Sequence, residues 1–220
     1  MFGDVFSIAH SVKGEGFDEI ARRNGGTAVY RVTSSDPASL NFHVTARYDG
    51  QPVAEGESRL DRDGMAECFN GACHKSTDAS GLLYNQLIWG RPPARLVAGQ
   101  AWTVEIGTPW ELGPPAKQQV RVLAVDRAAR TATLLRQGSG EGRFANERSK
   151  LKITRAGKTY EVDVVPGAAH WRGWTTFRNG FIQADELVME REVRLVSPEL
   201  GELKASERIL MLLNAMPADN

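Results

Sequence analysis

The stretch Asn41–Tyr48, NFHVTARY, decides the fold of this chain. Its apolar and polar residues alternate strictly, so one set of side chains faces one side of an extended backbone and the other set faces the opposite side. The dipeptide Asp49-Gly50, which is typical of tight turns, follows directly. The stretch therefore predicts a half-buried β-strand that ends in a tight turn.

Turn signals recur at short intervals after this strand, and alternating segments lie between them. Strands joined by tight turns must be antiparallel, because a parallel pair needs a long crossover. We therefore predict a mostly β protein, in which a single antiparallel meander forms a curved sheet or an open barrel. The predicted turns are Asp49-Gly50, Asp63-Gly64, Asn70-Gly71, Asp126–Arg130, Ala156-Gly157, Pro166-Gly167, Asn179-Gly180 and Ser197–Gly201.

The first 26 residues show a different period. Val5, Ile8 and Val12 repeat at helical spacing, and Asn24–Gly26 is typical of a helix C-terminal cap. We expect a single domain, with an N-terminal helical segment over residues 1–26, an antiparallel β body over 27–215 and a tail over 216–220.

Two segments interrupt the meander. Asp78–Gly99 is dense in apolar residues without clean alternation, and Thr108–Ala116 combines several prolines with Trp110. Large apolar residues in loops usually pack onto another surface. Both segments are therefore predicted to cover one face or one mouth of the sheet.

Composition excludes some functions. Lys and Arg together number 27, Asp and Glu together also number 27, and the two signs are interspersed. No basic stripe is present to bind a phosphate backbone, so nucleic acid is not expected as a partner. No run approaches the roughly 18 apolar residues that a membrane span needs.

The hairpin Cys68–Cys73 contains both cysteines of the chain. With Asn70-Gly71 as a two-residue type I′ turn, Cys68 and Cys73 fall opposite each other, which suits a cross-strand disulfide. Disulfides persist in oxidising compartments, so we expect a periplasmic or secreted protein whose signal peptide has been removed.

A metal site formed by Cys68, Cys73 and His74, with His43 as a fourth ligand, is the alternative interpretation of the cysteines. Alternation turns His74 away from Cys73, and the spacing does not match common zinc motifs. We therefore predict no metal and no other cofactor.

Catalytic motifs are weak in this chain. Gly138–Gly142 contains a serine but lacks both the nucleophile-elbow pattern and a following helix. A hydrolase that uses His170 or His43 stays an alternative, although no acid or nucleophile can be placed beside either histidine. We lean against an enzyme and predict no catalytic residue.

Aromatic residues concentrate in Ala168–Phe181. Alternation places His170 and Trp174 on one face and Trp171 on the other, and one of these faces must be core. Most of the aromatic residues are then ordinary core residues, or else some line a ligand site. The candidate ligand contacts are Trp102, Trp110, His170, Trp171, Arg172 and Trp174.

The order of these parts resembles the periplasmic lipoprotein-carrier type of open β-barrel, in which a short N-terminal helix precedes a long meander whose concave face is covered by loops. The resemblance lies in architecture and includes no diagnostic motif. It implies, by analogy of fold, a concave apolar face suited to an acyl chain or another hydrophobic ligand.

We therefore expect a periplasmic or secreted protein that binds a hydrophobic or amphiphilic ligand, such as a lipid, on a concave sheet face. The alternative is an interaction or scaffold module of the cell envelope, in which a strand edge pairs with a protein partner. Arg191 and Glu207 interrupt the apolar faces of the last two strands; they either pair with each other or mark where the face becomes exposed.

Overall fold

The computed structural model of the chain describes residues 2–61, 66–75, 89–90, 93–106, 116–140 and 149–216. The strands within these ranges number thirteen. They are β1 (Phe2–Gly14), β2 (Ile20–Ser35), β3 (Ser39–Tyr48), β4 (Ala54–Asp61), β5 (Ala66–Phe69), β6 (Ala72–Lys75), β7 (Ala101–Ile106), β8 (Ala116–Asp126), β9 (Thr131–Gly140), β10 (Ser149–Arg155), β11 (Lys158–Arg178), β12 (Phe181–Ser197) and β13 (Gly201–Met216).

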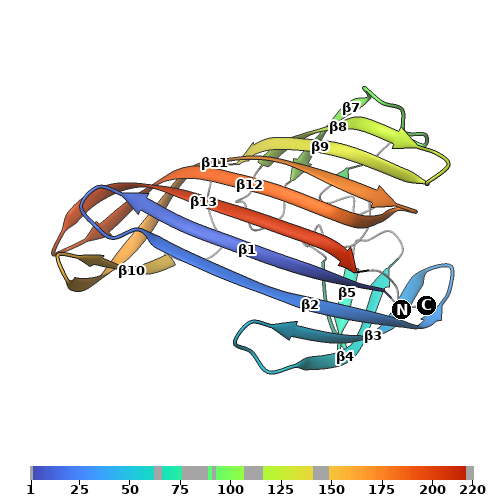
Figure 1. The fold of residues 1–220 in the computed structure, drawn as a ribbon, viewed down its shortest axis with the longest axis horizontal. Coiled ribbons are helices and arrows are strands. Elements are labelled where there is room, and N and C mark those ends of the chain that lie inside the picture. Colours follow the sequence, from blue (N-terminus) through green and yellow to red (C-terminus); the bar gives the residue numbers. More distant parts are fainter. Residues whose placement is uncertain are drawn as a thin grey trace.

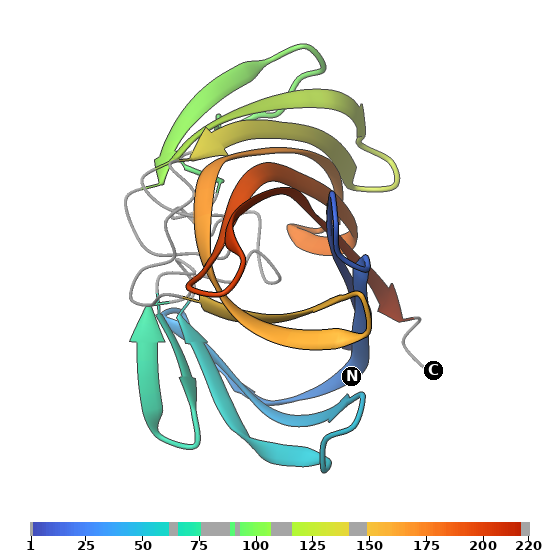
Figure 2. The ribbon, with the colours of Figure 1, turned by 90° about the vertical axis from the view of Figure 1, so that its left-hand side faces the viewer.

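All these strands belong to one antiparallel sheet (Figure 1). The strand order is β6-β5-β4-β3-β2-β1-β13-β12-β11-β9-β8-β7, and β10 pairs with the first half of β11. The sheet curls around an axis (Figure 2), but β6 and β7 stand at opposite ends of the order and the sheet does not close. The predicted open, curved antiparallel sheet is confirmed.

Most predicted turns within the described residues are present. Asn70, Ala156 and Asn179 each have positive φ and are followed by a glycine with positive φ, as a type I′ turn requires. Pro166-Gly167 was predicted as a turn, and this is wrong. The two residues lie at an irregularity inside β11, where its pairing with β12 shifts register between Pro166 and Ala169.

The predicted N-terminal helical segment is also wrong. Residues 2–14 form β1, which pairs with β13 on one side and with β2 on the other. A strand near the middle of the sheet carries apolar residues on both faces, and Val5, Ile8 and Val12 then imitate helical spacing. The predicted helix cap at Asn24–Gly26 lies inside β2.

Gly26 has a packing role in place of the predicted cap. A Cβ at this position would lie 2.9 Å from Cε1 of Phe6 and 2.4 Å from the backbone oxygen of Arg47. The phenyl ring of Phe6 therefore lies against the bare backbone of β2, and its centroid is 5.5 Å from that of Tyr48 on β3. Glycine at residue 26 permits this contact across three strands.

The core lies on one side of the sheet, which we call the inner side. One cluster surrounds Trp89, Leu134, Trp171 and Phe177, and a second surrounds Val12, Ile153 and Leu195. A smaller cluster on β2 and β3 contains Ala28, Phe42, Val44 and Ala46.

Part of the predicted covering segment Asp78–Gly99 lies in the described ranges and packs on this core. Trp89 is fully buried and Leu96 packs against the same cluster. The indole nitrogen of Trp102 on β7 donates a hydrogen bond to the backbone oxygen of Trp89, at 2.7 Å. Residues 76–88 and 107–115, which include Trp110, lie outside the described residues.

The predicted cysteine hairpin has the expected register. β5 pairs with β6 so that Cys68 lies opposite Cys73 and Phe69 opposite Ala72. Asn70 and Gly71 form the turn, with φ of 48° and 83°. The side chains of both cysteines lie outside the described part of the structure, so the disulfide stays a prediction.

Candidate ligand-binding face

The middle of the inner side is apolar but only half-covered. Phe6 and Ile8 on β1 lie opposite Leu213 and Met211 on β13, and His10 lies opposite Ile209. Side chains two residues apart share a face of the sheet, so these residues form one surface with Tyr48. We call this surface the inner strip; it consists of Phe6, Ile8, Tyr48, Ile209, Met211 and Leu213.

The exposure of the inner strip distinguishes it from the core clusters. Ile8 is 37% exposed and Tyr48 is 45% exposed. Ile209, Met211 and Leu213 are partly buried, and they pack against the cluster that contains Trp89. The strip is thus a half-covered apolar surface that joins a packed core along β13.

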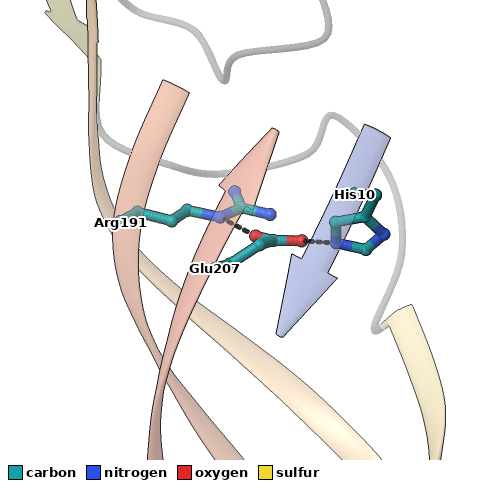
Figure 3. Close-up of polar contacts among 3 residues, drawn as sticks. All are labelled: His10, Arg191 and Glu207. Carbon is teal, nitrogen blue, oxygen red and sulfur yellow. Dashed lines mark hydrogen bonds and ion pairs between the residues drawn. The ribbon is translucent and has the colours of Figure 1, made fainter. Parts of the chain in front are cut away.

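A triad of polar side chains, two of them buried, borders the inner strip beside Ile209 (Figure 3). Arg191 on β12 lies directly opposite Glu207 on β13, and the guanidinium Nε donates to Oε2 of the carboxylate. His10 on β1 lies 2.6 Å from the other carboxylate oxygen through its Nε2. The exposed fractions of the three side chains are 1% for Arg191, 8% for Glu207 and 30% for His10.

The triad answers the question that the sequence left open about Arg191 and Glu207: the two residues pair. Burial raises the pKa of Glu207, but hydrogen bonds from His10 and Arg191, and the charges of both, outweigh it. The pKa of the carboxyl is therefore below its ordinary value of 4.5.

This lowered pKa predicts an acid-sensitive contribution to stability. The folded state holds the Glu207 proton less tightly than the unfolded state, so the contribution is complete above about pH 4.5 and is lost as the pH falls through the lowered pKa. Urea unfolding at a series of pH values should therefore show a smaller acid-induced loss of stability in Glu207→Gln than in the wild type. Identical pH profiles would contradict this account.

A second buried charge pair lies on the inner side, under Trp89. Nη2 of Arg136 on β9 donates to Oδ2 of Asp185 on β12 at 2.5 Å, and the hydroxyl of Thr175 on β11 donates to Oδ1 at 2.5 Å. The guanidinium carbon of Arg136 lies 5.2 Å from the ring centroid of Trp89. The pair thus links three strands to the covering segment.

Three buried nitrogen atoms at this pair have no hydrogen-bond acceptor among the described residues. Among the described residues, the buried side-chain atoms without a hydrogen-bond partner are Nε and Nη1 of Arg136 and Nε1 of Trp89. Arg136 is 1% exposed and Trp89 is fully buried. Unpaired buried donors are costly, so this position suits an acceptor oxygen from water or from a ligand.

The predicted contact residues are divided between the two sides of the sheet. Trp102 and Trp171 lie on the inner side, and the indole nitrogen of Trp171 donates to Oε1 of Gln118 at 3.1 Å. Trp171 is 3% exposed and belongs to the core cluster around Trp89. Of the two interpretations that the sequence left open for the aromatic residues, core or ligand site, the packing of Trp171 corresponds to core.

The other predicted contacts on β11 lie on the outer side. His170 and Arg172 are exposed, and Trp174 is 40% exposed. Alternation along β11 therefore separates them from Trp102 and Trp171, and the six residues do not make one site. Trp110 lies outside the described residues.

Of the residues in the alternative metal site, the structure describes the side chain of His43. The ring nitrogen Nδ1 of His43 lies 3.1 Å from Oε1 of Glu57 at an exposed position. Within the described residues, no three side chains of His, Cys, Asp or Glu lie close enough to hold a metal ion. In the same part of the chain, no helix is both long and apolar enough to cross a bilayer.

Sequence reasoning missed Phe6, Ile8, His10 and Arg136. The first three lie in the segment that was interpreted as a helix, which concealed their position on the inner side. Arg136 carried a usable signal, because it follows Ala132 and Leu134 at alternate positions of β9. Arg191 and Glu207 carried the same signal, because each is a charged residue in a series of alternate positions that is otherwise apolar.

The fold and the inner side define an open, curved antiparallel β-sheet protein with an apolar inner strip. No family model matches the chain, and no curated protein matches it. A conserved protein of unknown function with a hot dog fold, from Alicyclobacillus acidocaldarius, is similar to it. The match covers 97% of this chain and 80% of that chain, with 10% identity and a TM-score of 0.13. A similarity this weak supports no conclusion, so function is inferred from the inner side alone.

Proposed function

We propose that the protein binds a hydrophobic or amphiphilic ligand along the inner strip and serves as a carrier or sensor for it. The observation that carries the proposal is the exposure of large apolar residues at the centre of the inner side, where Ile8 and Tyr48 are 37% and 45% exposed. Inner positions of a curved sheet normally form its core. An apolar surface that remains half-covered there suits an apolar ligand.

The polar groups beside the inner strip support an amphiphilic ligand in particular. The strip borders the triad of His10, Arg191 and Glu207, and its β13 residues pack on the cluster of Trp89, whose ring lies against Arg136. Ligand sites commonly combine an apolar lining with a few fixed polar groups that orient the ligand. The donor nitrogens of Arg136 and Trp89 that have no partner within the described residues are groups of this kind.

A pair of substitutions on β1 tests the proposal. Ile8→Asp places a charge on the inner strip, whereas Val5→Asp places the same charge on the outer side of the same strand, where Val5 is 44% exposed. We expect Ile8→Asp to weaken binding of decanol by about tenfold or more, because a carboxylate in the apolar contact must be desolvated. Val5→Asp should bind decanol as the wild type does.

Isothermal titration calorimetry with decanol measures both affinities, and urea unfolding confirms that both variants are folded. Equal affinities for folded Ile8→Asp and Val5→Asp would count against the inner strip as the site. Absence of decanol binding by the wild type would favour a protein partner at a strand edge instead.

We further propose that the protein works in an oxidising compartment, the periplasm or the outside of the cell. The facing positions of Cys68 and Cys73 on β5 and β6 support this proposal, because a disulfide fits such a pair. The intact mass of protein from its native host should increase by two hydrogen atoms on reduction. Two free thiols before reduction would remove the support.

A further inference from the structure

A cavity lies at one end of the sheet, beside two hairpin turns. The turn between β8 and β9 and the turn between β11 and β12 lie side by side (Figure 1), and the backbone nitrogen of Asn179 donates to the oxygen of Arg130 at 3.0 Å. The cavity has a volume of about 300 Å³. This volume is at the lower end of the range of small-molecule sites, which begins at about 300 Å³.

The rim of this cavity is basic. Arg95, Arg127 and Arg130 line it together with a single carboxylate, that of Asp126. Oδ1 of Asp126 accepts a hydrogen bond from the backbone nitrogen of Ala129, at 2.9 Å. In the part of the chain that the structure describes, the three guanidinium groups have no ion-pair partner. The rim is therefore positive in a chain whose formal net charge is zero.

The floor of the cavity is apolar and joins the core. Leu96, Val125 and Phe177 line it. Leu96 and Val125 pack against the same cluster as Met211 and Leu213 of the inner strip, and Phe177 is a buried member of that cluster. Guanidinium groups above an apolar floor match a ligand that has an anionic head and an apolar tail.

We infer that Arg95, Arg127 and Arg130 bind the anionic head of the ligand, a phosphate or carboxylate group, while the apolar part extends from Leu96 and Val125 towards the inner strip. The inference rests on the proposed function, since it assigns the polar end of the same ligand. The guanidinium groups supply paired donors and positive charge, which phosphate and carboxylate groups both accept. Because the rim is exposed, added salt should weaken the contribution of the anionic head to the binding affinity.

Calorimetry with decyl phosphate, decanol and inorganic phosphate tests the inference. The wild type should bind decyl phosphate about tenfold or more tightly than decanol at low salt. The double variant Arg127→Ser/Arg130→Gly should lose this preference and keep its affinity for decanol. Glycine suits residue 130, where φ is 53°, so the variant should fold. The control Arg31→Ser/Arg121→Ser removes the same charge from exposed strand positions elsewhere and should keep the preference.

The outcomes separate this inference from the proposed function. Equal binding of decanol and decyl phosphate by the wild type would overturn the basic rim as a head-group site and leave the inner strip intact. If inorganic phosphate binds as tightly as decyl phosphate, the apolar tail adds nothing to the affinity. That result would overturn the inference of an amphiphilic ligand and indicate a site for free anions. A wild type that binds none of the three overturns both proposals.

Discussion

Replacing Arg191 by alanine should lower the free energy of unfolding by about 3 to 5 kcal/mol, because the carboxylate of Glu207 is left buried without its guanidinium partner. The exposed fractions of the two side chains are only 1% and 8%. The matched control is Arg194→Ala on the outer side of the same strands, where Arg194 pairs with Glu202 at 2.9 Å and both side chains are about half-exposed. Exposed pairs contribute at most about 1 kcal/mol.

Urea unfolding measures both losses. The double variant Arg191→Met/Glu207→Leu should be about as stable as the wild type, because it leaves no buried charge uncompensated. A loss for Arg191→Ala no greater than that for Arg194→Ala would mean that water reaches the triad. The triad would then not be the buried border of the inner strip.

Replacing Trp171 by alanine should cost about 3 to 5 kcal/mol, as expected for removing a large aromatic side chain from a packed core. The ring of Trp171 covers Gly138, where an added Cβ would lie 2.4 Å from its Cζ2. The substitution also removes the hydrogen bond to Gln118. Trp174→Ala is the matched control, since Trp174 lies three residues along β11 on the outer side and is 40% exposed.

Trp174→Ala should change stability by less than about 1 kcal/mol, because exposed positions without special contacts contribute little. Thermal and urea unfolding of the two variants therefore determine which face of β11 is core. A larger loss of stability for Trp174→Ala than for Trp171→Ala would mean that the outer side of the sheet, and not the inner side, forms the core. The inner strip would then be assigned to the wrong face.

Alternation was sufficient to predict the sheet wherever a strand has one buried and one exposed face. β11 shows this clearly, since Trp171, Thr175 and Phe177 are buried while His170 and Trp174 are exposed. The turn dipeptides then required antiparallel neighbours. Neither signal reveals how far the curved sheet closes, because closure depends on twist and strand stagger.

The same rule failed at β1, whose two faces both carry apolar residues because β1 lies between β13 and β2. Hydrophobic spacing alone then resembles that of a helix. The glycines of β2 strengthened the error, since a ring contact such as that of Phe6 with Gly26 leaves no local signal in the sequence.

The candidate site could be predicted only in part, because it depends on contacts between distant strands. Aromatic density on β11 indicated Trp171, which is core, and Trp174, which is on the outer side. The inner strip combines β1 with β13, which are separated by nearly the whole chain. Charged residues in apolar registers, such as Arg136, Arg191 and Glu207, were the more informative signal.

The most direct test of the inner strip as a ligand site is nuclear magnetic resonance with isotope-labelled methionine methyl groups. Met211 belongs to the strip, whereas Met189 is fully buried in the core cluster. With decanol bound, the account predicts a large shift of the Met211 methyl resonance and nuclear Overhauser contacts from this methyl to the decyl chain. A Met211 resonance that stays unchanged at saturating decanol, with no contact to the chain, would contradict the account.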